Sequence, residues 1–356
     1  MREPVVPPQR YVRSSEGPQP NVVRGRMKAG AILRSLRTAH RNDCRAVLVL
    51  AAGYLATGLV PRRLDCWLVP RLLKSRLIVR RDSIGRMKER IRSALGDFPL
   101  SRDLGDVARQ CAVVGRENQW LRWRATHGDN LPVRTSVEAL HVLESALERG
   151  RGAVLWGFDF CDPLLVKVAL ARAGQHLVHL STPEHGTSSP SSEFGRAVVS
   201  PLYCLPENRF IDERVMIPLD GSLGYMRTLM DRLKNNRCVY IAGERRARRA
   251  ITRASVFGRS ASFARGAPGL AQRMGSPLLP IYVVRDGPLH YRAVIDDEIG
   301  ADRELEKERF IDQAVAEFAR RLESHVVAHP AEWGWWSSHV AAELSVLDEN
   351  HEPRAS

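Results

Sequence analysis

The sequence predicts an α/β fold in which helices cover both faces of a mainly parallel sheet. Short apolar runs alternate along the chain with longer stretches of helical periodicity, and this alternation is typical of parallel strands joined by crossover helices. The chain has 356 residues, enough for one large domain or two ordinary ones. Because 44% of these residues are hydrophobic, a substantial core is possible and a wholly disordered chain is excluded.

The net charge of the chain indicates which classes of partner it could bind. Lys and Arg number 54 against 40 acidic residues, which gives a net charge of +14. That excess favours an anionic partner, which could be a phospholipid surface, an acidic carrier protein or nucleic acid. The six cysteines are irregularly spaced without a C-x-x-C pair, so we expect reduced thiols and no metal site. The N-terminus lacks an apolar signal region, which argues against export.

The N-terminal part reads as two segments. Residues 1–27 are rich in Pro and Arg and predict a disordered basic arm. Residues 28–130 predict a helical, membrane-associating region, because Ala46–Val60 carries no charge over fifteen residues and is flanked by arginines. A bilayer-spanning helix needs about 20 residues, so we expect a helix lying in the headgroup layer. A buried core helix of a soluble protein is the alternative.

Residues 131–340 predict the α/β domain, and 341–356 a flexible tail. Apolar runs at 153–156, 176–180, 214–219, 238–243 and 278–284 predict strands. Helices are predicted at Ser136–Arg149, Gly224–Asn235, Pro268–Met274 and Lys307–His329.

Several motifs together resemble one family. They are the block Val256–Arg285 (VFGRSASFARGAPGLAQRMGSPLLPIYVVR), the upstream VYIAGERR at 239–246, and HPAEWGWW at 329–336. Their order and spacing resemble the late (lauroyl and myristoyl) acyltransferases of lipid A biosynthesis, in the lysophospholipid acyltransferase superfamily. The resemblance implies a glycerolipid acyltransferase-like fold and a site at the inner face of the cytoplasmic membrane. There a fatty acyl group would pass from an acyl carrier protein or coenzyme A thioester to a hydroxyl or amine of a lipid or metabolite. The resemblance implies no further cofactor and does not indicate an oligomeric state.

The same motifs supply candidate substrate-binding residues. Glycines allow the backbone to approach a ligand closely and expose its N–H groups, and arginines bind phosphate in a bidentate fork. The alternative interpretation of the GERRARRA run is a solvated basic surface that binds no ligand. The motifs give the candidates Glu244, Arg245, Phe257, Gly258, Arg259 and Gly266. The segment ENRFIDERVMIPLDG resembles the family's Arg-bearing stretch before the next helix, which implies Arg209 as a further candidate, with Arg214 as its rival.

The sequence departs from the family at the catalytic motif. Family members carry a His after the strand at 153–156 and a carboxylate five residues later, whereas LWGFDFCDPLL places Asp159 and Leu164 at those positions. An ordinary Asp, with a pKa near 3.9, is a poor base for a hydroxyl. Asp159 could act with its pKa raised by Asp162, or a remote histidine, His179 or His185, could supply the base.

Two other interpretations remain. The chain could be a catalytically silent relative that binds lipid or carrier protein, having lost the base. Nucleic-acid binding is the weaker alternative, because aromatic residues make up only 6% and no nucleic-acid motif is present. An acyl-Cys161 intermediate is disfavoured, because adjacent aspartates oppose formation of the thiolate. The candidates for the chemical centre are therefore Asp159, Asp162 and His185.

Overall fold

The computed structural model describes residues 41–74, 81–96, 98–100, 102–187, 192–243, 251–300, 302, 304–337 and 345–346. The predicted basic arm at 1–27, and the candidates Glu244 and Arg245, lie outside these residues. Most of the predicted tail at 341–356 does so as well.

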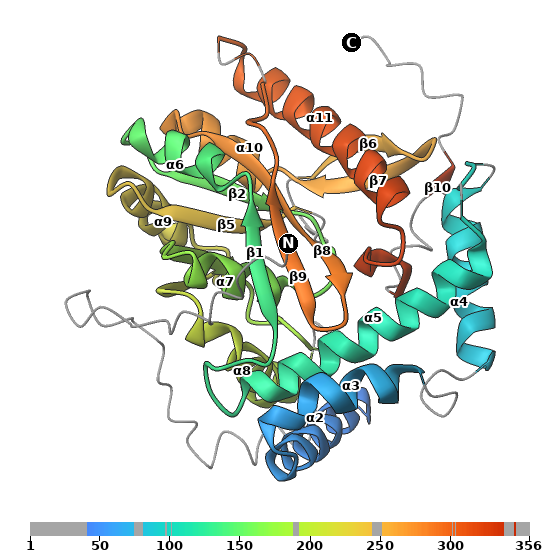
Figure 1. The fold of residues 1–356 in the computed structure, drawn as a ribbon. Coiled ribbons are helices and arrows are strands. Elements are labelled where there is room, and N and C mark those ends of the chain that lie inside the picture. The colour runs from blue at the N-terminus through green and yellow to red at the C-terminus, as the bar shows by residue number, and fades with distance from the viewer. Residues whose placement is uncertain are drawn as a thin grey trace, which may run out of the picture.

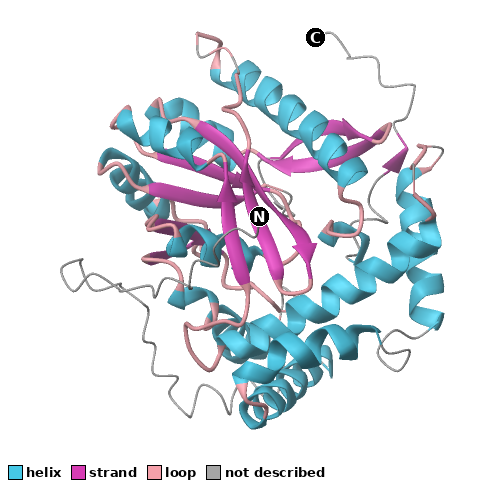
Figure 2. Ribbon diagram, viewed as in Figure 1, coloured by secondary structure: helices cyan, strands magenta, loops and turns pink. Residues whose placement is uncertain are grey.

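A seven-stranded sheet forms the centre of the molecule (Figures 1 and 2). Its strand order is β1-β9-β8-β2-β5-β3-β4, and the neighbouring strands are parallel except for the antiparallel pair β8 and β9. The predicted α/β class with a mainly parallel sheet is confirmed. The strands are β1 Arg134–Glu138, β2 Ala153–Gly157, β3 Leu177–Ser181, β4 Glu213–Met216, β5 Cys238–Ala242, β8 Leu278–Gly287 and β9 His290–Ile295.

Helices cover both faces of this sheet, and they bury the central strands on both sides. Alternate residues of each strand enter opposite cores, so Trp156 packs with α11 on one face while Leu155 packs with α7 on the other. The helices of the domain are α6 Leu140–Glu148, α7 Pro163–Arg172, α8 Ser200–Cys204, α9 Gly224–Lys234, α10 Gly266–Met274 and α11 Lys307–Ala328.

A smaller sheet adjoins α11. The hairpin strands β6 (Ile251–Val256) and β7 (Arg259–Ala264) pair antiparallel, and β10 (Ser345–Val346) joins β7. Phe257 and Gly258 form the two-residue turn with φ of 55° and 70°, the positive values that tight hairpin turns require.

In the described part of the chain, four α-helices precede the sheet: α2 Arg41–Leu59, α3 Asp65–Lys74, α4 Arg81–Leu95 and α5 Leu104–Ala125. The helix predicted across 46–60 is therefore present within α2. Among the described residues, no single helix has the length and hydropathy of a membrane span, although α2 and Arg62–Arg71 reach that threshold as a pair bent by 94°. Gly53 lets α2 pack on α5, because a Cβ at this position would lie 2.1 Å from the ring of Trp123.

Three sequence expectations were wrong in detail. The helix expected at Ser136–Arg149 begins only at Leu140, because the first residues form the edge strand β1 against β9. Strand β9 was not predicted, since its polar and apolar residues share no simple period. The first part of the Val256–Arg285 block, which was not predicted as a strand, is largely the β6–β7 hairpin.

Candidate active site

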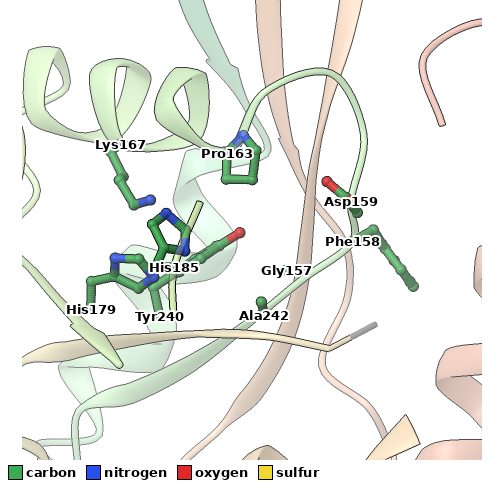
Figure 3. Close-up of a pocket in the computed structure, with 9 residues that line it drawn as sticks. All are labelled: Gly157, Phe158, Asp159, Pro163, Lys167, His179, His185, Tyr240 and Ala242. Atoms are coloured by element: carbon green, nitrogen blue, oxygen red, sulfur yellow. The ribbon is translucent and has the colours of Figure 1, made fainter. Parts of the chain in front are cut away.

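A pocket opens at the carboxyl ends of three adjacent strands, β2, β5 and β3 (Figure 3). In parallel α/β sheets this is the edge where ligands usually bind. Asp159 and His185, two candidates from the sequence, both contribute to its wall. The lining residues are Gly157, Phe158, Asp159, Pro163, Lys167, His179, His185, Tyr240 and Ala242.

The turn after β2 gives the pocket its shape. Gly157 ends the strand beside Tyr240, whose hydroxyl oxygen would lie 2.3 Å from a Cβ at position 157. The backbone then reverses through Cys161, which has a φ of 52°. Asp162 caps α7 by accepting a hydrogen bond of 2.8 Å from the N–H of Leu164. The strand and the capped helix therefore fix both ends of the turn that carries Asp159.

The carboxylate of Asp162 is held in an ion pair and is therefore a poor candidate for an acid or base. Its carboxylate pairs with the guanidinium of Arg122 on α5, at 2.8 Å from Nε and 2.5 Å from Nη2. The carboxylate therefore joins α7 to α5 while capping the helix. Cys161 beside it is no better as a nucleophile, because burial raises the pKa of its thiol well above the ordinary value.

A buried carboxylate that the sequence analysis missed organises the inner side of the pocket. Glu207, in the 3₁₀ helix Glu207–Arg209, is fully buried. Its Oε2 accepts hydrogen bonds of 2.8 Å from Lys167 Nζ and from Arg214 Nη2, and its Oε1 lies 3.0 Å from His185 Nε2 and 3.1 Å from Arg122 Nη2. Burial alone would raise the pKa of Glu207, but Lys167, His185 and Arg122 hold it well below its usual range.

The two other polar groups at this end of the pocket carry perturbed pKa values. Burial lowers the pKa of Lys167 from 10.5 to about 8, against the opposing effect of Glu207. Burial also lowers the pKa of His179 well below its usual value, reinforced by Lys167 and Arg214. His179 is therefore a neutral imidazole at physiological pH, and its Nδ1 has no hydrogen-bond partner among the described residues.

The C-terminal motif HPAEWGWW packs against the turn that carries Asp159. The N–H of Gly334 donates a hydrogen bond of 2.7 Å to the carbonyl of Asp159, and the N–H of Cys161 donates one of 2.7 Å to the carbonyl of Glu332. Phe160 and Trp333 form an isolated antiparallel β-bridge between the two segments. The segment therefore supports the backbone of the turn, a contact that sequence spacing does not reveal.

Among the described residues, no candidate binding residue of the C-terminal half lines the pocket. Phe257 is buried against Trp333, with ring centroids 6.1 Å apart, and its N–H donates to Glu323. Gly258 is the second residue of the hairpin turn and has a positive φ of 70°, and its role in ligand binding stays a prediction. Gly266 is the first residue of α10.

The two candidate arginines are placed differently. Arg259 opens β7 and lies close to Gly96, where a Cβ would meet its Nη2 at 3.0 Å. Arg209 pairs with Asp129 at 3.1 Å and donates to the carbonyl of Thr126. Its rival Arg214 contacts Glu207 behind the pocket. Neither arginine lines the pocket, and the binding role of this segment stays a prediction.

The family comparison matches this architecture. Residues 203–339 match the family model of bacterial lipid A biosynthesis acyltransferases. The matched region includes Glu207, the β6–β7 hairpin and the C-terminal motif, and it begins after the turn that carries Asp159. No curated protein matches the chain. The protein is therefore lipid A acyltransferase-like in this region.

Proposed function

We propose that this lipid A acyltransferase-like protein transfers a fatty acyl group from an acyl carrier protein or coenzyme A thioester. The acceptor would be a hydroxyl or amine of a lipid or metabolite at the cytoplasmic face of the inner membrane. Its oxygen or nitrogen attacks the thioester carbonyl and gives up a proton to a base. The carbon–sulfur bond then breaks, and the thiol leaves with a proton.

The observation that carries this proposal is the shared pocket of Asp159 and His185. Asp159 follows strand β2, and His185 comes from the turn after β3, two strands that flank β5 in the sheet. The pocket therefore contains a histidine from a segment other than the one in which the family resemblance places it. Figure 3 shows His185 and the Asp159 carboxylate on either side of the same space.

His185 is the better candidate for the base. Imidazole is the side chain that enzymes use most often as a general base. Glu207 lies 3.0 Å from His185 Nε2 and can orient its ring, as carboxylates orient histidines in catalytic dyads. Asp159 then faces the acceptor, where its negative charge can accept a hydrogen bond from the nucleophile.

Helices α2 and α3 support action at a membrane surface. Both expose large apolar side chains, including Leu55 at 64%, Leu59 at 85% and Trp67 at 55%. The exposed arginines Arg45 and Arg63 accompany them. Apolar side chains flanked by arginines suit the boundary between acyl chains and anionic headgroups.

Thioester turnover by the purified protein tests the proposal. Wild type, Asp159→Asn, His185→Gln and the surface control His141→Gln would be compared across acyl-CoA and acyl-carrier donors with lipid and small acceptors. We expect His185→Gln to lower turnover by about 10²–10⁴-fold, Asp159→Asn to lower it less, and His141→Gln to have no effect. Absence of turnover by wild type with every combination would contradict the proposal.

A catalytically silent relative is the second candidate, because an aspartate occupies the family's histidine position. Such a protein would bind the acylated donor or the lipid without turning it over. Binding of a non-hydrolysable acyl-CoA analogue, together with absence of turnover, would favour this candidate over the enzyme.

A further inference from the structure

The buried cluster behind the pocket holds more positive than negative charge. Three cations, Arg122, Lys167 and Arg214, surround two carboxylates, Asp162 and Glu207. Even with the adjacent histidines neutral, this leaves one excess positive charge. All five side chains are at most 11% exposed. Water therefore screens that charge poorly, and the field acts on whatever enters the pocket.

Two groups of this cluster keep hydrogen-bonding capacity at the pocket. The ammonium of Lys167 has three N–H donors. Among the described residues, it donates a hydrogen bond to Glu207. His179 is 3% exposed, and its Nδ1, which lies 3.7 Å from Glu207 Oε2, lacks a hydrogen-bond partner within the described chain. Buried polar groups are nearly always satisfied in folded proteins. Such capacity beside a pocket is therefore suited to a polar ligand.

Lys167 and Asp159 stand at opposite ends of the pocket. Figure 3 shows Lys167 reaching in from α7 beside His179 and His185, with Asp159 across the space on the turn after β2. The pocket is thus positive at its inner end and negative near Asp159. This polarity would orient an acceptor that has an anionic group at one end and a nucleophile at the other.

We propose that the inner end of the pocket, formed by Lys167 and His179, binds a compact oxyanion of the acyl acceptor. The oxyanion is a carboxylate or a phosphate lying a few bonds from the hydroxyl or amine, which lies between His185 and Asp159. This assignment rests on the proposed function and specifies its acceptor. Lys167 and His179 are at most 3% exposed, and the pocket has a volume of about 70 Å³, so it suits a compact group, whose charge water screens poorly.

Matched acceptors test the assignment on the unmodified protein. Turnover of one acyl thioester would be measured with glycerol 3-phosphate against glycerol, and with serine against serinol, which lacks the carboxylate. We expect the anionic member of at least one pair to have a kcat/KM at least tenfold higher. The phosphate and carboxylate pairs distinguish the two sources of the oxyanion. Equal use of both members in both pairs would overturn the proposal.

A substitution at Lys167 tests whether this side chain causes the preference for anionic acceptors. We expect Lys167→Met to lower, at least tenfold, the ratio of kcat/KM for the preferred anionic acceptor to kcat/KM for its neutral counterpart. The control Lys234→Met, at an exposed position on α9, should not change this ratio. A parallel loss with both acceptors would assign Lys167 a structural role and overturn the proposal. Circular dichroism and thermal unfolding show whether Lys167→Met remains folded, and the matched-acceptor comparison on wild type does not depend on it.

A binding measurement separates this proposal from the proposed function. Inorganic phosphate would be titrated into wild type and Lys167→Met by calorimetry. Phosphate binding that is lost in the variant supports the oxyanion site even if no acceptor is turned over. Turnover without any anion preference, or phosphate binding that is equal in both proteins, contradicts the oxyanion site and leaves the acyl-transfer proposal standing.

Discussion

Gly334 and Asp159 are joined by a main-chain hydrogen bond of 2.7 Å, donated by the N–H of Gly334 to the Asp159 carbonyl. The two residues are far apart in sequence, yet they adjoin because the segment after α11 returns to the carboxyl end of β2. A Cβ at position 334 would lie 2.9 Å from the Asp159 carboxylate and 3.1 Å from its carbonyl oxygen. The C-terminal motif therefore helps to position the turn at the pocket.

Replacing Gly334 with alanine should disturb that turn. We expect Gly334→Ala to lower acyl-transfer turnover at least tenfold, because the added methyl group must displace Asp159. Stability should fall by about 1–3 kcal/mol, the usual cost of forcing atoms into a packed site. Turnover and thermal unfolding would be measured. The control is Gly224→Ala, where a Cβ meets nothing within 4 Å, and equal behaviour of the two variants would contradict this role.

Asp162 is expected to matter mainly for stability. Asp162→Asn removes the charge that pairs with the buried Arg122, and breaking a buried ion pair on one side typically costs about 3–5 kcal/mol. Denaturant unfolding measures the loss. In Asp106→Asn the broken pair with Arg109 is more than half exposed, so the expected loss is below about 1 kcal/mol. Similar losses in both variants would contradict the assignment.

Exposed leucines of α2 should determine membrane binding. We expect Leu55→Glu/Leu59→Glu to reduce co-sedimentation with anionic phospholipid vesicles at least tenfold, because burial of a leucine contributes about 1.5–3 kcal/mol. Leu219 and Leu223, also 63% and 69% exposed, lie in the α/β domain and provide the matched control as a double glutamate variant. Loss of vesicle binding in the control alone would place the membrane-facing surface there instead.

Acid should destabilise the protein through Glu207. A carboxylate whose pKa is lowered on folding stabilises the native state above its unfolded pKa, and this contribution is lost as pH falls towards the folded pKa. The pKa of Glu207 is held well below its ordinary value of 4.5. The free energy of unfolding of wild type should therefore decline below about pH 4.5. Denaturant unfolding across pH 3–6 would show a smaller decline for Glu207→Gln, and identical slopes would contradict the role of Glu207.

The sequence determined those features that depend on local pattern. Apolar runs located β2, β3, β4, β5 and β8, and helical periodicity located α9 and α11. The order of motifs indicated the family. Asp159 was chosen from its place after the strand at 153–156, and the structure places it in the wall of the pocket.

Tertiary structure decided which side chains meet. The sequence did not indicate that Glu207 is the centre of a buried cluster. Its partners Lys167, His185 and Arg214 come from three different segments of the chain. Asp162 was chosen for its nearness to Asp159 along the chain, yet it pairs with Arg122 on α5. Strand and helix periods follow from the backbone geometry of neighbouring residues. Ion pairing depends instead on how distant segments pack, and burial decides how strongly those charges interact.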